Sequence, residues 1–217
     1  MFWKSETTAY LDANANTFMS DKTIKVMNNW FNRGNSSARY QSAVEARTMI
    51  QNFRSELAWY TSPDFHFVFT SGASESNAHI IRSTTMAFAK RTGRIPHVVA
   101  SAAEHKSIIL CLEELENYRA ITYTLVRSSP SLRGAVDLGD IKNAVRADTC
   151  LITVMAANNE TGAVNNLVDI YRYARSVNIP FHTDAVQIFG KNPSFCVNCD
   201  AFSVSFHKLS GPIGCGL

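Results

Sequence analysis

The amino-acid sequence predicts an α/β layered fold built on a mainly parallel sheet. The first observation is that short apolar, β-rich runs alternate with stretches of helical periodicity along most of the chain. The second is that several of these runs are followed directly by small or polar residues, as expected where parallel strands end. The third is composition: 46% of the 217 residues are hydrophobic and 18% are charged, which fits one packed domain, or one domain plus part of another.

The predicted elements place helices between strands. A long amphipathic helix comes first, from about residue 40 to residue 60, with an apolar face made of Ala46, Met49, Ile50, Phe53 and Leu57. Strands are then expected at 66–70, 97–101, 121–126, 149–155, 180–183 and 201–205, with helices near 75–90, 108–115, 138–145 and 167–177. This alternation favours a parallel sheet. The last residues, 211–217, resemble a turn that leads into a further strand, so we expect a sheet truncated at the C-terminus with an exposed pairing edge.

Bulk properties exclude several classes of protein. The formal net charge is +3 and the basic residues are scattered, so nothing indicates binding to nucleic acid or to an acidic membrane. No apolar run reaches the roughly 18 residues of a membrane span, and the N-terminus lacks the pattern of a secretory signal. The five cysteines are an odd number, which favours reduced thiols over a disulfide framework. We therefore expect a cytoplasmic protein.

A phosphate-binding segment is the first candidate for function. Thr70-Ser-Gly-Ala-Ser-Glu-Ser76 follows an expected strand and opens an expected helix. A helix N-terminus presents free N–H groups and a partial positive charge, which suits a phosphate. Ser71, Ser74 and Ser76 add hydroxyl donors. The alternative is an ordinary helix start with Ser74 as its capping residue.

An acid and a lysine each follow a later strand. Asp184, in Phe181-His-Thr-Asp-Ala-Val-Gln187, stands at an expected strand end, where ligands bind in an open α/β sheet. Pyridoxal phosphate (PLP) needs a carboxylate beside its pyridine nitrogen and a lysine amine to hold its aldehyde. Asp184 and Lys208, the latter in Ser203-Val-Ser-Phe-His-Lys208, have the chemistry for these roles. The alternatives are a helix N-cap for Asp184 and an exposed lysine at a strand end for Lys208.

Two further polar segments also follow expected strands. Asn158-Asn-Glu-Thr-Gly162 is placed for ligand contact, or is a polar turn closed by Gly162. Ala103-Glu-His-Lys-Ser107 contains His105, which either lies flat on an aromatic ring or caps the next helix. Each segment alone fits both interpretations. Because all five stand at strand ends, one crevice along the sheet edge is expected to collect them.

Together these segments resemble the motifs of the NifS/IscS-type cysteine desulfurases, in the class V aminotransferase group of fold-type I PLP enzymes. The resemblance runs from about Tyr10 to the C-terminus. It rests on Tyr10-Leu-Asp12, Gly34-Asn35, Thr70 to Ser76, Glu104-His-Lys106, Asn158 to Gly162, His182 to Gln187 and Ser205-Phe-His-Lys208. It implies a three-layer large domain, residues 36–217, after an N-terminal segment of residues 1–35, and it implies that the C-terminal small domain is absent.

The resemblance also implies a role for each site residue. Lys208 forms the Schiff base with PLP, Asp184 pairs with the pyridine nitrogen, and His105 stacks on the ring and moves protons. Gln187 bonds the ring oxygen and Asn159 lies near the ring, while the phosphate is held by Ala73, Ser74, Ser205 and His207. The implied reaction takes sulfur from L-cysteine as a persulfide and releases alanine. The implied partners are a sulfur-acceptor protein and, for the full-length chain, a second copy in a homodimer.

Departures from the family pattern bear on activity. Phe206 stands where the family has a glycine, so we expect a rearranged or looser phosphate site. Ser36 replaces a proline of the family's glycine-asparagine turn. The family's nucleophilic cysteine and its substrate-binding arginine would lie beyond Leu217. We therefore expect these 217 residues alone to have no desulfurase activity.

Other hypotheses stay open. A NifS-like protein that has lost catalysis would serve as a PLP-binding or scaffold protein, which Phe206 favours. Selenocysteine lyase or another class V activity also fits, because a fold does not fix a reaction. Cys196-Val-Asn-Cys199 is open to a redox or zinc role, but no second cysteine pair exists and structural zinc normally takes four ligands, so we expect no metal. If the source is a virus, a location in the virion is also expected.

Overall fold

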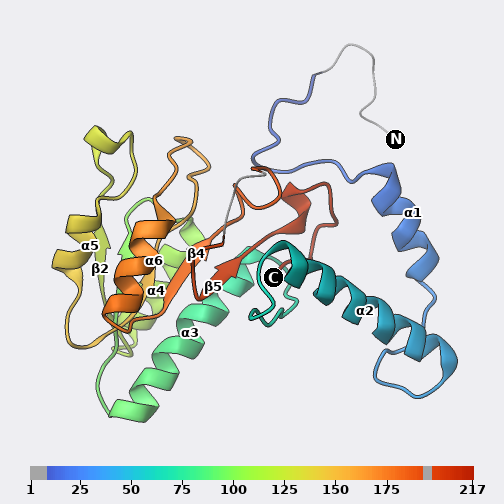
Figure 1. The fold of residues 1–217 in the computed structure, drawn as a ribbon, viewed down its shortest axis with the longest axis horizontal. Helices are drawn as coiled ribbons and strands as arrows, with labels where there is room; N and C mark the ends of the chain where they lie inside the picture. Colours follow the sequence, from blue (N-terminus) through green and yellow to red (C-terminus); the bar gives the residue numbers. More distant parts are fainter. Residues whose placement is uncertain (1–8, 193–196) are drawn as a thin grey trace.

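In the part of the chain that the structure describes, five parallel strands form one sheet, with α1 (Asp21–Trp30) and α2 (Gln41–Tyr60) extending to one side of it (Figure 1). The computed structural model describes residues 9–192 and 197–217 of the chain. The strands lie side by side in the order β2-β1-β3-β4-β5, and each neighbouring pair is parallel. Their bounds are His97–Ser101 for β1, Thr122–Val126 for β2, Thr149–Thr153 for β3, Phe181–Asp184 for β4 and Ala201–Ser203 for β5. The predicted α/β fold with a mainly parallel sheet is confirmed.

Helices precede and separate the strands as the sequence pattern indicates. Their bounds are Asp21–Trp30 for α1, Gln41–Tyr60 for α2, Ala73–Thr92 for α3, Lys106–Asn117 for α4, Leu138–Ala144 for α5 and Leu167–Ser176 for α6. Short 3-10 turns occupy Pro130–Leu132 and Phe206–Lys208. The helix α1 was not predicted, although Ser20 caps it and Asp21 opens it. Within the described ranges, no helix has both the length and the apolar character needed to cross a bilayer.

The helices cover both faces of the sheet and complete a three-layer arrangement. Val98 packs in one buried cluster with Ile81 of α3 and Leu112 of α4. Val99, its neighbour on β1, belongs to a second cluster with Ile170 of α6. Successive side chains of a strand point to opposite faces, so the two clusters lie on the two sides of the sheet. Full burial of each such side chain contributes about 1.5–3 kcal/mol to stability.

A buried histidine fixes the strands that carry the site. His182 of β4 bonds through Nδ1 to Thr153 Oγ1 of β3 at 2.9 Å and through Nε2 to Ser203 Oγ of β5 at 3.0 Å. Burial lowers the pKa of His182 to about 3, so its ring is neutral at physiological pH. These bonds hold the ends of three neighbouring strands in register.

The prediction of a buried strand at residues 66–70 is wrong. Phe67 is buried, but Val68 is 56% exposed, and the segment is extended without a strand assignment. Within the described ranges, the backbone of this segment pairs with another segment only through one antiparallel bridge, between Thr70 and Gly216. A strand needs a row of backbone partners, and this apolar run is held mainly by side-chain packing instead. Gly216 also bridges Ser205, so the last residues add an antiparallel contact beyond β5.

Candidate active site

A small cavity at the carboxyl ends of the strands collects the predicted site residues. Its volume is about 230 Å³. The lining contains Ala15 and Val186 together with all nine predicted residues, which are Ala73, Ser74, His105, Asn159, Asp184, Gln187, Ser205, His207 and Lys208. These residues come from the start of α3, from the segments after β1 and β3, from the end of β4 and from the turn after β5. The expected crevice along the sheet edge is therefore present.

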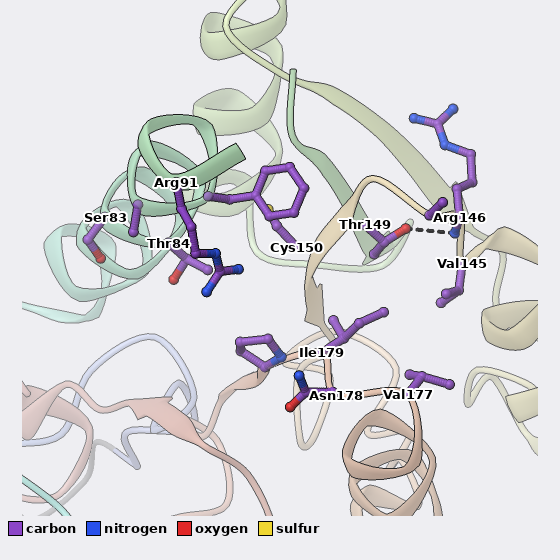
Figure 2. A pocket seen from close by; sticks show the side chains of 14 residues that line it. Ser83, Thr84, Arg91, Val145, Arg146, Thr149, Cys150, Val177, Asn178 and Ile179 are labelled. Carbon is purple, nitrogen blue, oxygen red and sulfur yellow. Dashed lines mark hydrogen bonds between the residues drawn. The ribbon is translucent and has the colours of Figure 1, made fainter. Parts of the chain in front are cut away.

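A larger cavity lies at the opposite edge of the sheet, where the strands begin (Figure 2). Its volume is about 710 Å³, and its lining includes Arg91 of α3, Arg146, Cys150 of β3 and Asn178. Burial raises the pKa of the Cys150 thiol to about 12, so this sulfur is a poor nucleophile. None of the predicted site residues lines this cavity. The predicted site residues are therefore found at the smaller cavity and not at this one.

Asp184 is the buried carboxylate of the small cavity. It is the last residue of β4 and is only 5% exposed. Its Oδ2 accepts from Asn77 Nδ2 at 2.9 Å, and its Oδ1 accepts from the Val186 N–H at 3.0 Å. Burial raises the pKa of the Asp184 carboxyl, while the bonds from Asn77 and Val186 and the nearby His105 and Lys208 oppose that rise. The chain after Asp184 forms turns, so the helix N-cap alternative is wrong.

Lys208 lines the same cavity and is the last residue of the 3-10 turn that follows β5. Its side chain is partly buried. Burial lowers the pKa of the Lys208 amine, and Asp184 and Asp12 oppose that change. A lowered pKa leaves a larger fraction of the amine neutral, which is the form that attacks an aldehyde. The alternative of a solvent-exposed lysine does not hold.

His105 both caps a helix and lines the cavity. It is the N-cap of α4, where its Nδ1 accepts from the Ser107 N–H at 3.2 Å and lies 2.8 Å from Ser107 Oγ. Burial lowers the pKa of His105, and the positive charges of Lys208 and Lys106 lower it further, while Asp184 opposes them. The capping alternative is therefore confirmed, and it leaves the ring at the cavity wall.

Asn159 also reaches the cavity from a tight turn. Its neighbour Asn158 closes that turn, since Asn158 Oδ1 accepts from the N–H groups of Glu160 at 2.9 Å and Thr161 at 2.8 Å. Gly162 has a φ of 71°, a left-handed conformation that glycine adopts without strain. The polar-turn alternative is therefore correct, and the turn carries Asn159 to the cavity wall.

The start of α3 forms the end of the cavity that is predicted to hold the phosphate. Its N-cap is Gly72, with a φ of 155°, so Ser74 lies inside the first turn and is not the capping residue. Ser205 Oγ accepts from the Ala73 N–H at 2.8 Å, which leaves the Ser205 proton to be donated to an anion. Of the three serines in the segment 70–76 that were predicted as donors, Ser74 alone lines the cavity. Ser71 bonds Glu75 instead, at 2.6 Å, and Ser76 bonds Thr70 at 2.8 Å.

Phe206 does not disturb this end of the cavity. Its ring lies 6.0 Å from that of Phe53 on α2, centroid to centroid, and it lines a different hollow. Phe206 is not among the residues with a positive φ, so its backbone makes no demand for glycine. Whether the phosphate site is rearranged or looser than in the family stays a prediction.

The N-terminal segment closes one side of the cavity, a contact that the sequence did not predict. Thr17 Oγ1 donates to the His207 carbonyl at 2.8 Å and accepts from the Ser210 N–H at 2.7 Å. The Thr17 N–H donates to the same His207 carbonyl at 2.8 Å. Ala15 lines the cavity beside it. These bonds hold the turn that carries Lys208.

Thr17→Val is expected to lower the free energy of unfolding by about 1–3 kcal/mol, because the Ser210 N–H loses its acceptor. Urea unfolding of the full-length protein measures the change. Thr92→Val is the matched control, since Thr92 also makes two such bonds, to Phe88 O and from the Arg94 N–H, but at an exposed helix end. An equal loss in both variants would show that Thr17 has no special anchoring role.

Glu104 is a buried acid beside the site that the sequence reading left without a role. Its Oε1 accepts from the Met155 N–H at 2.6 Å, and its Oε2 is buried without a partner among the described residues. Burial raises the pKa of Glu104 well above the ordinary value of 4.5, and the nearby Asp184 raises it further. Burial therefore favours the neutral form of Glu104, whose bond to Met155 anchors the segment carrying His105 to the residues after β3.

Glu104→Gln is expected to raise stability more at high pH than at low pH. A raised folded-state pKa means that the stability contributed by neutral Glu104 is complete below about 4.5 and is lost as pH rises through the folded-state value. The advantage of the variant, which cannot ionise, should grow by up to about 1.4 kcal/mol per pH unit within that window. Melting temperatures between about pH 5 and pH 9 measure it. Glu114→Gln, at an exposed position on α4, should change stability little. A flat difference for Glu104→Gln would contradict the buried neutral acid.

The architecture and the site together define a class of protein. A parallel α/β sheet whose carboxyl edge gathers a helix N-terminus, a buried carboxylate and a partly buried lysine is the arrangement of the large domain of fold-type I PLP enzymes. The family follows from comparison with known families. Residues 9–217 match the family described as aminotransferase class-V, and the chain belongs to this family, whose cofactor is PLP.

Individual relatives are similar over nearly all of this chain. Cysteine desulfurase IscS of Rickettsia prowazekii (strain Madrid E) is 34% identical over 214 residues, which are 95% of this chain and 50% of the relative. Selenocysteine lyase of Bos taurus is 33% identical over 232 residues, covering 94% and 53%. A solved structure described as SspA in complex with cysteine is 33% identical, with a TM-score of 0.84 over 96% of this chain and 60% of that one. The chain spans about half the length of the curated relatives it matches.

The cavity fits PLP in chemistry as well as in composition. A volume of about 230 Å³ suits a single-ring ligand more than a dinucleotide. Asp184 is a buried acid that two donors keep in place, which suits a protonated ring nitrogen. The Ser205 hydroxyl and the N-terminus of α3 suit a phosphate. Lys208, with its lowered pKa, suits an aldehyde. The role of each residue stays a prediction.

Proposed function

We propose that the full-length protein is a PLP-dependent cysteine desulfurase, which takes sulfur from L-cysteine and releases L-alanine. One observation carries the proposal: the nine residues that the family pattern assigns to the cofactor come from five separate stretches of chain, and all line one cavity. The similarity to cysteine desulfurase IscS supports the same substrate. Sulfur metabolism is the proposed setting.

The side chains of the cavity have complementary tasks in this reaction. When bound, PLP withdraws electrons from the substrate's Cα. Asp184 holds the proton on the ring nitrogen, which requires its buried carboxylate. The Lys208 amine holds the aldehyde and, once released, moves a proton at the substrate's Cα. His105, whose pKa is lowered by burial, offers a neutral imidazole as a second proton carrier.

The sulfur transfer requires a thiolate near the substrate. In the proposed step the C–S bond of L-cysteine breaks and an S–S bond forms on the protein. The electron pair of the broken bond stays on the substrate carbon, which takes up a proton and becomes the methyl group of alanine. None of the four described cysteines lines the cavity, and burial raises the pKa of each thiol in Cys111, Cys150, Cys199 and Cys215. We therefore place the accepting thiol outside the described residues; Cys196 also lies outside them.

Product analysis of the full-length protein tests the proposal. With PLP, L-cysteine and a reducing thiol, we expect alanine and sulfide in equal amounts. L-selenocysteine serves as the competing substrate, since a relative is a selenocysteine lyase. A strong preference for selenocysteine would replace the proposed substrate. Bound PLP without alanine from either substrate would favour the alternative of a catalytically impaired PLP-binding or scaffold protein. Phe206, which favoured that alternative, lines a different hollow and lies near Phe53.

Other properties belong to the same proposal. A homodimer, a sulfur-acceptor protein and a cytoplasmic location rest on the family resemblance and on the sequence, with a location in the virion if the source is a virus. The four described cysteines are unpaired to one another, which is compatible with a reducing compartment. The division into residues 1–35 and 36–217 stays a prediction. Size-exclusion chromatography with light scattering of the full-length protein tests the dimer.

A further inference from the structure

An asparagine outside the predicted set lies behind the cavity wall. Asn77 is fully buried in α3, four residues after Ala73 and therefore on the same face of the helix. Its amide nitrogen donates to Asp184 Oδ2 at 2.9 Å and to Ser107 Oγ at 3.1 Å. Its Oδ1 is buried without a partner among the described residues. Burying an unpaired carbonyl costs about 1–3 kcal/mol, so an asparagine here needs a reason other than stability.

Charge fixes the orientation of this amide. Turning it over would place Oδ1 against the Asp184 carboxylate, so that two acceptors would meet. With Nδ2 toward both partners, each amide hydrogen has one acceptor. Asn77 therefore acts as a two-armed donor between β4, which ends at Asp184, and the start of α4, which contains Ser107.

The hydrogen bond from Asn77 to Ser107 bears on which ring nitrogen of His105 carries the proton. Ser107 Oγ accepts from Asn77 and lies 2.8 Å from His105 Nδ1, and because that nitrogen is an acceptor for a backbone N–H, the Ser107 hydroxyl is the donor of this pair. His105 Nδ1 also accepts from the Ser107 N–H at 3.2 Å. A nitrogen that accepts from two donors carries no proton, so the neutral ring holds its hydrogen on Nε2.

We propose that Asn77 is a positioning residue that holds the Asp184 carboxylate and, through Ser107, fixes His105 as the neutral Nε2–H tautomer. The meaning of this role rests on the proposed function, in which Asp184 and His105 face the cofactor. Asn77 thereby connects Asp184, the proposed partner of the ring nitrogen, to His105, which is proposed to stack on the ring. Losing Asn77 should affect both, while losing Ser107 should affect only the histidine.

The charged neighbours set the expected direction of change. His105 faces Asp184, Lys208 and Lys106, while Asp184 faces His105, Lys208 and Glu104. None of these groups is altered in the proposed variants. In Ser107→Ala, Nδ1 of His105 loses the hydroxyl donor that competes with a proton for the same lone pair, so the pKa of His105 should rise. In Asn77→Leu, the Ser107 hydroxyl no longer accepts from Asn77 and can turn to accept from Nδ1–H, so the pKa of His105 should rise in this variant as well.

The test uses the PLP-loaded full-length protein with two spectroscopic readouts. NMR of isotope-labelled histidine rings, assigned with His105→Gln, measures the titration of His105 and its tautomer. The pH midpoint of the bound cofactor's absorbance measures the environment of Asp184. Ser107→Ala should move the first readout only, and Asn77→Leu should move both, with turnover reduced about tenfold. Thr85→Val is the matched control, because Thr85 is a buried polar residue of the same helix that bonds only within it. It should move neither readout.

Each outcome decides the proposal. If Asn77→Leu lowers stability yet leaves both midpoints at wild-type values, the residue is merely structural and the proposal is wrong. If Ser107→Ala leaves the titration and the tautomer of His105 unchanged, the proposed link from Asn77 through Ser107 to His105 is wrong. Should Asn77→Leu fail to fold, the nearly isosteric Asn77→Asp sets two carboxylates side by side, and an unchanged cofactor midpoint then overturns the proposal. The NMR readout does not depend on turnover, so absent alanine formation would refute the proposed function while leaving this inference standing.

Discussion

Lys208→Ala is expected to abolish covalent attachment of PLP and to lower turnover by at least about a thousand-fold in the full-length protein. Lys208 lines the cavity in the turn that follows β5, with a lowered pKa that favours the reactive amine. Borohydride reduction fixes the cofactor to the amine that holds it, and mass spectrometry of the digested protein then identifies that residue. In the wild-type protein we expect the pyridoxyl group on Lys208.

Lys191 is the serious competitor for this assignment. Burial lowers the pKa of its amine too, and its Nζ donates to Gln187 Oε1 at 2.8 Å, beside the cavity. A pyridoxyl group found on Lys191 would refute the assignment of Lys208. Lys142→Ala is the control, because this exposed lysine on α5 lies over the Tyr173 ring, remote from the site. It should leave both attachment and turnover unchanged.

Most of the residues that line the cavity could be predicted because they stand at or just after the end of a strand. Parallel strands bring their carboxyl ends to one edge, so Asp184 and Lys208 meet although they are separated along the chain. Individual hydroxyls could not be assigned in the same way. Ser71 and Ser76 lie in the predicted phosphate segment but are engaged by Glu75 and Thr70. Whether a serine donates to a ligand depends on local hydrogen bonds that spacing does not reveal.

The roles of Asn77 and Glu104, which do not line the cavity themselves, could not be predicted from the sequence for a related reason. Asn77 and Glu104 act through bonds to Asp184, the last residue of β4, and to Met155, just after β3, which are distant from them along the chain. The helical offset of four residues from Ala73 was an available signal for Asn77, since it places both on one helix face. The segment 66–70 shows the opposite failure: an apolar run predicts burial, but a strand also needs backbone partners.

Asp184→Asn is expected to keep the fold and part of the cofactor binding while lowering turnover by about a thousand-fold. The amide still offers an oxygen to the Val186 N–H, and Asn77 can rotate its own amide to meet the new NH₂ group. The neutral side chain, however, cannot keep the pyridine nitrogen protonated, so electron withdrawal from the substrate is weakened. Absorbance at saturating PLP measures occupancy, and alanine formation measures turnover separately. Asp148→Asn, at an exposed ion pair with Arg146 near the opposite edge of the sheet, should change neither.

Chemical rescue separates the charge of Asp184 from its shape. Asp184→Ala should lose turnover to a similar extent and leave space beside the ring nitrogen. A PLP analogue methylated at that nitrogen carries a permanent positive charge, so it no longer needs a carboxylate to stay charged. We expect the analogue to restore part of the turnover of Asp184→Ala and to give no gain in the wild-type protein, where the buried Asp184 leaves no room for the methyl group. If Asp184→Asn works at the wild-type rate with the cofactor saturated, or if the analogue rescues nothing, Asp184 is not the partner of the ring nitrogen.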